Sequence, residues 1–135
     1  MSADLVLAHE APKTVLVVAD DPFLRKLARR QLESLGCVAH EVVSVSRALA
    51  RIAERTPDLI LLDLWVDHGE GLALLERLRA HAATRKTPVL LVGMEPRLEV
   101  RTRAFALGAS GPAPVYESGV FGSCVDAALD RCRLT

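Results

Sequence analysis

The stretch 57-PDLILLDLWVDHGEG-71 decides the fold. Its residues 59–62 form an uninterrupted apolar run, which is typical of a strand buried on both faces of a parallel sheet. The run ends in Asp63, so a carboxylate directly follows the apolar residues. Open α/β sheets place their chemistry at the carboxyl ends of parallel strands, which makes Asp63 a candidate site residue. The alternative is an acid that caps a helix or is simply solvated, and this stretch alone does not decide between the two.

Strand-like and helix-like segments alternate along the rest of the chain. Apolar runs predict two further buried strands at 15–18 and 89–92, a weaker outer strand at 37–43 and a fifth strand at 109–115. The fifth strand contains Pro112 and Pro114, which lack backbone donors, so it can lie only at a sheet edge. Apolar residues at helical spacing predict helices over 22–35, 44–56, 71–82, 97–107 and 121–132. The predicted fold class is therefore α/β, a doubly wound five-stranded parallel sheet with helices on both faces.

Composition limits the possible classes of protein. A chain of 135 residues that is 50% hydrophobic can bury one core, and we expect a single domain over residues 13–135 after a flexible lead-in of residues 1–12. Seventeen basic and seventeen acidic side chains cancel and form no basic block, so we expect no binding to nucleic acid or to an anionic membrane. No apolar run approaches the ~20 residues of a membrane span, and the first residues lack a signal-peptide pattern. A cytoplasmic protein is expected, with free thiols at Cys37, Cys124 and Cys132.

Two carboxylates are expected to share one cleft. The first predicted strand runs into Asp20 and Asp21, and Asp21 has a structural role as the cap of a helix that begins at Pro22. Because the first, third and fourth strands are the most apolar, they should be central neighbours, which brings Asp20 beside Asp63. A hard divalent cation such as Mg²⁺ suits two such carboxylates, and an aspartate beside it can attack a phosphoryl group and become an acyl phosphate. Two solvated loop acids that share no ion are the alternative.

The chain resembles the receiver domain of bacterial two-component response regulators, including the single-domain chemotaxis type. The resemblance extends from Thr14 to about Arg133 and lies in VLVVADDPFLR at 15–25, PDLILLDL at 57–64, GEG at 69–71, TPVLLV at 87–92 and LGASG at 107–111. It implies that Asp63 is the phosphoryl-accepting aspartate. It also implies that Asp20 contacts Mg²⁺ directly and that the backbone carbonyl of Trp65 completes the metal site.

The sequence departs from the family pattern at several functional positions. Ala19 stands where the family has the first acid of the metal-binding pair, Gly93 where it has a Thr or Ser hydroxyl, and Val115 where it has a lysine. Pro112 replaces the aromatic switch residue, and Asp67 replaces a loop proline. These departures predict weak metal binding, a poor phosphoryl acceptor and impaired switching.

Three functions remain open from sequence. The first is a receiver that a histidine kinase phosphorylates on Asp63, in atypical form. The second is a pseudo-receiver that acts purely through protein–protein interaction. The third is a flavodoxin-like ligand binder or enzyme, and it is the least favoured because residues 19–22, Ala-Asp-Asp-Pro, would repel the phosphate that such loops bind. The two favoured functions make no enzyme of the chain, so we expect none.

For a partner or a homodimer, the resemblance points to the surface formed by the fourth helix, fifth strand and fifth helix. Arg97, Arg101 and Arg103 supply positive charge there. A solvated polar helix is the alternative explanation of these arginines.

Overall fold

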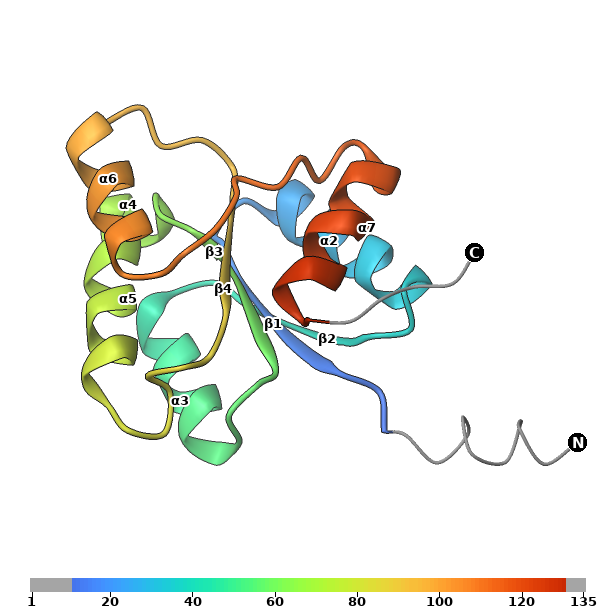
Figure 1. Cartoon of the computed structure of the whole chain (residues 1–135), viewed down its shortest axis with the longest axis horizontal. Helices are drawn as coiled ribbons and strands as arrows, with labels where there is room; N and C mark the ends of the chain where they lie inside the picture. Colours follow the sequence, from blue (N-terminus) through green and yellow to red (C-terminus); the bar gives the residue numbers. More distant parts are fainter. Residues whose placement is uncertain (1–10, 131–135) are drawn as a thin grey trace, which may run out of the picture.

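A computed structural model describes residues 11–130 (Figure 1). All but the last two residues of the expected lead-in at 1–12 therefore lie outside the described residues, as does Cys132. The strands are β1 (Thr14–Val18), β2 (Val38–Val42), β3 (Leu59–Asp63) and β4 (Val89–Val92). The helices are α2 (Pro22–Ser34), α3 (Val45–Glu54), α4 (Val66–Gly69), α5 (Gly71–Ala80), α6 (Leu98–Ala106) and α7 (Ser118–Ala128).

The four strands form one parallel sheet in the order β2-β1-β3-β4. Helices α2 and α7 lie on one side of the sheet and α3, α5 and α6 on the other, as Figure 1 shows. The predicted α/β class, the helices on both faces and the outer position of β2 are therefore confirmed. The order also places the carboxyl ends of β1, β3 and β4 next to one another.

Alternate residues of each strand build two separate cores. Leu59 and Leu61 face α2 and α7, whereas Ile60 and Leu62 face α3, α5 and α6. All five residues of β3 are buried, because this strand is central and is covered on both faces. Asp63 is thus the last residue of a central strand that is buried along its whole length.

Local signals in the sequence set the helix ends near the site. The Asp21 carboxylate caps α2 by accepting a hydrogen bond from the Phe23 amide at 2.9 Å, and Pro22 occupies the first helical position. Ser44, not Ser46, caps α3. In the part of the chain that the structure describes, no helix has the length and apolar character that a membrane crossing requires. Cys37 and Cys124 are not joined in a disulfide bond, and Cys37 is buried.

The prediction of a regular fifth strand at 109–115 is wrong. Ser110 forms a single bridge with Leu90, and the Ala113 amide donates to the Leu91 carbonyl at 2.8 Å. Pro112 and Pro114 have no amide hydrogen to extend this ladder, and the bond between Gly111 and Pro112 is cis. The prolines thus do more than confine the segment to an edge, since the described sheet has four strands instead of five.

The predicted loop after Asp63 contains one short helical turn, α4. Asp67 and His68 within it have positive φ, and the Asp67 carboxylate accepts a hydrogen bond from the Val45 amide at 2.7 Å. Asp67 therefore ties this loop to the first turn of α3.

Candidate functional site

Asp63 occupies the last position of β3, where three strands end together. Its register partner on β4 is Val92, and Asp20 follows β1 by two residues. The negative charge of Asp20 acts on the Asp63 carboxyl, so the structure brings these two predicted site residues into one electrostatic environment. Asp20 itself is exposed, whereas Ala19 is fully buried.

The Asp63 side chain is nine-tenths buried and only partly satisfied. Oδ1 accepts a hydrogen bond from the Trp65 amide at 2.9 Å, and Asp63 is 8% exposed. Within residues 11–130, no group donates a hydrogen bond to Oδ2. Burial raises the pKa of the Asp63 carboxyl, the Trp65 amide opposes this rise, and the charges of Asp20, Asp21 and Glu95 add to it. Among the described residues, no basic side chain is a cause that lowers the pKa of Asp63.

Gly93 allows the chain after β4 to pass directly over this carboxylate. A Cβ atom at position 93 would lie 3.2 Å from Asp63 Cγ and 3.3 Å from each carboxylate oxygen. Gly93 also has a φ of +74°, a conformation that β-branched residues strongly disfavour. Position 93 therefore lacks a hydroxyl, and its backbone conformation would also be strained by a threonine.

Removing the Asp63 charge should stabilise the fold at neutral pH. Asp63→Asn keeps an acceptor for the Trp65 amide but removes a buried, half-satisfied charge, which should raise the free energy of unfolding by about 1–3 kcal/mol at pH 7. Because the pKa of Asp63 is raised, the native carboxyl binds its proton at a higher pH than the unfolded one. The free energy of unfolding of the wild type therefore rises as the pH falls through the raised pKa. The difference in stability between the Asp63→Asn variant and the wild type should vanish in acid.

Urea unfolding of both proteins at pH 7 and in acid measures this effect. Asp20→Asn is the matched control, since an exposed acid should change stability by less than about 0.5 kcal/mol. An Asp63→Asn protein less stable than wild type at pH 7 would show that the carboxylate is stabilised by something other than these contacts.

A cleft of about 520 Å³ opens beside Asp63 between α2 and the segment before α7. Its lining includes Leu24, Met94 and Val115, and no basic side chain takes part. Val115 is 2% exposed and belongs to the core that packs on α2 and α7, while its carbonyl accepts a hydrogen bond from the Gln31 side chain. In place of the family lysine, the cleft thus has an apolar wall.

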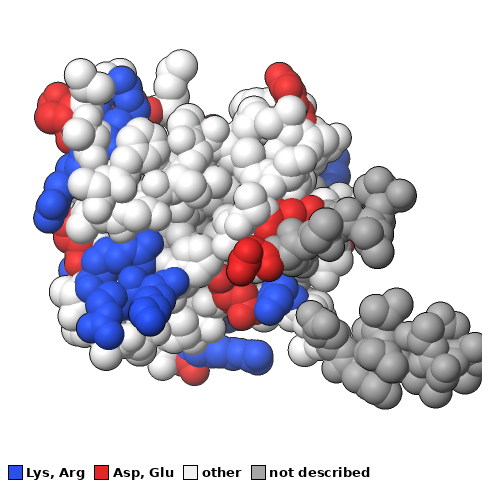
Figure 2. All heavy atoms as spheres, viewed as in Figure 1, with Lys and Arg blue, Asp and Glu red and all other residues white. Residues whose placement is uncertain are grey.

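The rim of this cleft carries exposed rings. Tyr116, which lines the cleft, stacks on Phe23 with ring centroids 6.2 Å apart, and both rings are about two-thirds exposed. Met94 on the opposite side is 83% exposed. In Figure 2 the upper surface between α6 and α7 is largely uncharged, with the acidic and basic side chains concentrated elsewhere. Sequence reasoning did not find this apolar rim, because its members come from three separate segments.

A magnesium ion would find few ligands here. The Asp21 carboxylate is engaged as a helix cap, and the Trp65 carbonyl already accepts a hydrogen bond from the Gly69 amide at 3.1 Å. That carbonyl keeps one free lone pair, and Asp20 and Asp63 Oδ2 supply the other oxygens. Over residues 11–130, no group of three or more acidic, His or Cys side chains is arranged to hold a metal. The donor set fits only a weakly held ion that keeps most of its waters.

The two loops that follow β3 and β4 are joined by an interaction that the sequence analysis missed. Arg97 donates to both carboxylate oxygens of Glu95, at 2.9 Å from Nε and 2.8 Å from Nη2, and its guanidinium lies 5.0 Å from the centroid of the Trp65 ring. We call Glu95, Arg97 and Trp65 the loop clamp, because it joins the loop after β4 to the loop after β3. The Arg97 hydrogen bonds lower the pKa of Glu95, so this acid stays ionised. The Glu-Pro-Arg sequence at 95–97 was the available signal.

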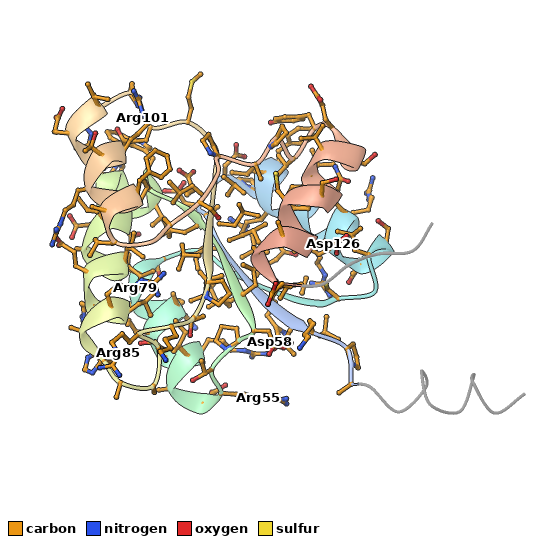
Figure 3. All side chains as sticks on the ribbon, viewed as in Figure 1. Arg55, Asp58, Arg79, Arg85, Arg101 and Asp126 are labelled. Carbon is orange, nitrogen blue, oxygen red and sulfur yellow. The ribbon has the colours of Figure 1, made fainter. Side chains whose placement is uncertain are left out.

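The three arginines predicted to form a partner surface have different contacts. Arg97 belongs to the loop clamp. Arg101, which lies in the first half of α6 and is labelled in Figure 3, donates a hydrogen bond of 2.6 Å to the Glu95 carbonyl. Arg103 pairs with Glu76 on α5 at 3.4 Å, with both side chains about half exposed. Two of the three arginines therefore also hold the loop that precedes α6.

A second cavity of about 330 Å³ lies under the loop between β4 and α6. Leu91, Phe105 and Pro112 line it, together with Gly93. Pro112 stands at the predicted switch position, and its small ring leaves this space open. Movement of an aromatic side chain into the cavity from position 112 is therefore impossible in this chain.

Comparison with known proteins identifies the family. Residues 15–112 match the model of the response regulator receiver domain. The chain is 35% identical over 108 residues to the KDP operon transcriptional regulatory protein KdpE of Escherichia coli, a match that covers 80% of this chain and 45% of that protein. It is 32% identical over 95 residues to the phosphate regulon transcriptional regulatory protein PhoB of Rhizobium meliloti, covering 70% of this chain and 42% of that protein. The chain thus spans less than half the length of these curated relatives.

Solved structures agree with this assignment. A putative response regulator from Chloroflexus aurantiacus is 25% identical, with a TM-score of 0.78 and coverage of 90% of this chain and all of that one. The chemotaxis response regulator CheY4 of Vibrio cholerae shares the fold, with a TM-score of 0.77 at 20% identity over 87% of this chain and 99% of that one. Receiver domains are signalling modules that interact with histidine kinases and can dimerise. The chain belongs to the response regulator receiver domain family, whose members are modules of phosphorelay signalling.

Proposed function

We propose that this chain is an atypical receiver in which Asp63 accepts a phosphoryl group slowly and in which phosphorylation scarcely changes the conformation. The observation that carries the proposal is the environment of Asp63. This buried carboxylate ends a central strand and lines a cleft in which no described Lys, Arg or His side chain takes part. It has the position of an acceptor but lacks the groups that would stabilise a transferred charge.

The chemistry requires little of the protein beyond positioning. Asp63 Oδ2, as the carboxylate, would attack the phosphorus atom of a phosphohistidine whose other ring nitrogen carries a proton. The O–P bond forms as the P–N bond breaks, and the electron pair of that bond leaves with the ring as neutral imidazole. The Trp65 amide fixes the other carboxylate oxygen. A bound Mg²⁺ would neutralise the charge that develops on the phosphoryl oxygens.

The missing groups set the expected rate. Each preorganised donor that stabilises developing charge is worth roughly 10²–10³ in rate. Val115 supplies no ammonium, and Gly93 supplies no hydroxyl. Asp20, Asp21 and Glu95 add negative charge near the acceptor instead. We therefore expect transfer to Asp63 to be much slower than to a receiver that carries both groups.

Phosphorylation by a small donor tests the proposal. With phosphoramidate and Mg²⁺, intact mass should show partial, slow modification that Asp63→Asn abolishes and Asp20→Asn reduces. Trp65 fluorescence should report Mg²⁺ binding only at millimolar or higher concentration, as weak oxygen sites require. Rapid stoichiometric modification would show that the departures at Ala19, Gly93 and Val115 do not impair the site. A complete absence of modification under forcing conditions would favour the pseudo-receiver function, in which the chain acts only through protein binding.

For partner binding, the proposal keeps the surface of α6, the 109–115 segment and α7. Arg103 is the arginine best placed to contact a partner, because its bond to Glu76 is long and both groups are exposed. Homodimerisation through this surface is proposed on the same ground, and the chain has no proposed catalytic activity of its own. If Arg103→Glu leaves the self-association constant and kinase binding unchanged, the partner surface lies elsewhere.

A further inference from the structure

We infer that the cleft at Asp63 is a binding site for an organic ammonium group on an alkyl stem, the chemistry of a lysine side chain or of a free alkylamine. The site is formed by the unpaired Oδ2 of Asp63 at its base, the apolar wall at Val115 and the aromatic rim at Tyr116. The inference rests on the proposed function in that Asp63 is the functional carboxylate. Amine binding and phosphoryl transfer are measured separately, so the failure of one is distinguishable from the failure of the other.

The charge of the cleft favours a cation. Asp63 is nine-tenths buried, and among the described residues nothing donates to its Oδ2, although Oδ2 still contacts the cleft. Asp20 and Asp21 carry further negative charge at the same edge of the sheet. Among the described residues, no basic side chain lines the cleft. Arg97 is held by Glu95 in the loop clamp, and Arg25, which donates to the Ala19 carbonyl, is paired with Glu41. A mostly buried carboxylate that accepts a single hydrogen bond is costly to keep ionised, and a cation from outside the chain would lower this cost.

The walls of the cleft favour an alkylammonium over a hydrated metal ion. Mg²⁺ keeps several waters that need polar partners, whereas Leu24, Met94 and Val115 offer only apolar surface. An alkyl stem can lie against such walls while its ammonium reaches a carboxylate. Tyr116, stacked on Phe23 at the rim, adds an aromatic face of the kind that attracts ammonium groups. The volume of about 520 Å³ leaves ample room for a four-carbon stem.

Titration with n-butylammonium tests the site, with n-butanol as the neutral probe of equal size. The signal is the backbone amide shift of Trp65, which donates directly to Asp63. We expect saturable shifts at Trp65 and Gly93 with butylammonium, at a dissociation constant on the order of 10 mM for so small a ligand. Butanol should bind at least about tenfold more weakly, because it lacks the charge-assisted hydrogen bond.

Two variants make the result specific. Asp63→Asn should weaken butylammonium binding by about tenfold or more, with folding checked by circular dichroism. Val115→Lys should abolish binding, since it supplies an ammonium from within the chain. Val38→Lys adds the same charge at an exposed position at the start of β2, at the other end of the sheet, and should leave binding unchanged. Equal binding of butanol, or unchanged binding by Asp63→Asn, would overturn the inference. Saturation of the same amides by Mg²⁺ alone, with no response to butylammonium, would also overturn it.

A comparison of two peptides decides whether the ammonium comes from a partner protein or from a free amine. The peptide acetyl-Ala-Lys-Ala-amide is compared with its glutamine counterpart. Preferential binding of the lysine peptide supports a partner protein that inserts a lysine into the cleft. Binding of free butylammonium without any preference between the peptides supports a free amine as the occupant.

Discussion

Replacing Val115 with lysine should raise the rate at which Asp63 accepts a phosphoryl group from phosphoramidate by about 10²-fold or more. Val115 lines the cleft into which Asp63 opens, so an ammonium introduced there can reach both the carboxylate and the incoming phosphoryl oxygens. The lysine ammonium would form an ion pair with the Asp63 carboxylate, which in the wild type feels only the negative charges of Asp20, Asp21 and Glu95. The rate is measured by intact mass at a fixed Mg²⁺ concentration.

The matched control for this prediction is Val115→Met. It keeps the length and apolar stem but adds no charge, so its acceptor rate should stay within about twofold of wild type. Val115 is 2% exposed and packs in a core, so some stability will be lost in both variants, and the stem of lysine can still extend into the cleft. If the lysine variant is folded and no faster than the methionine variant, the missing ammonium is not what limits Asp63.

Restoring the hydroxyl at Gly93 is expected to fail as a rescue. A threonine there would have to adopt φ near +74°, at a cost of about 1–2 kcal/mol or more, and its Cβ would lie 3.2 Å from Asp63 Cγ. Addition of Thr to the Val115→Lys protein should therefore lower stability without a comparable gain in rate. Lysine alone is the more informative substitution.

Replacing Arg79 with methionine should cost about 2–4 kcal/mol of unfolding free energy. The Arg79 guanidinium donates to four backbone carbonyls, those of Leu107 at 2.6 Å, Thr87 at 2.7 Å, Arg85 at 3.2 Å and Thr84 at 3.3 Å. It therefore joins the end of α5, the loop that leads to β4 and the end of α6; Figure 3 labels Arg79 on α5. Burial lowers the pKa of this arginine, and among the described residues no acid forms an ion pair with it.

Urea denaturation measures this loss, with Arg77→Met as the control. Arg77 lies on the same helix, is exposed and should change stability by less than about 0.5 kcal/mol. Arg79→Lys should recover only part of the loss, because one ammonium cannot reach carbonyls in three segments with the geometry of the planar guanidinium. A methionine variant as stable as wild type would mean that water replaces the arginine at these carbonyls without cost.

The fold was predictable where local and long-range signals agree. The continuous apolar run before Asp63 identified the central strand, and Asp21 with Pro22 identified the start of α2. The 109–115 segment was the exception, because its apolar pattern suggested a strand while Pro112 and Pro114 removed the donors that a strand needs. Backbone hydrogen bonding prevailed over side-chain pattern there.

The candidate site was predictable in part for a similar reason. The meeting of Asp20 and Asp63 follows from the strand order, because the three most apolar runs were expected to be central neighbours and β1, β3 and β4 are adjacent. The loop clamp and the stacked rings of Phe23 and Tyr116 do not follow, because they depend on how separate loops are placed in space. The positive φ of Gly93 also depends on the folded loop, and the sequence indicates it only through the presence of a glycine directly after a strand.

The central claim is that occupation of Asp63 leaves the rest of the molecule nearly unchanged. A phosphoryl group shifts an equilibrium only through its different interactions with two conformations, and a shift from 1:99 to 99:1 needs about 5.5 kcal/mol. Gly93 offers it no side chain to grip, and Pro112 has no large ring to move into the cavity beneath α6. The loop clamp also holds the intervening loop in place.

Backbone amide shifts with and without beryllofluoride, a mimic of the phosphoryl group on Asp63, test this claim most directly. The measurement is made at a mimic concentration that saturates the shift of the Trp65 amide. The account predicts changes confined to residues near Asp20, Asp63 and Gly93. Large shifts extending from Arg97 through α6 to Val115 would contradict it.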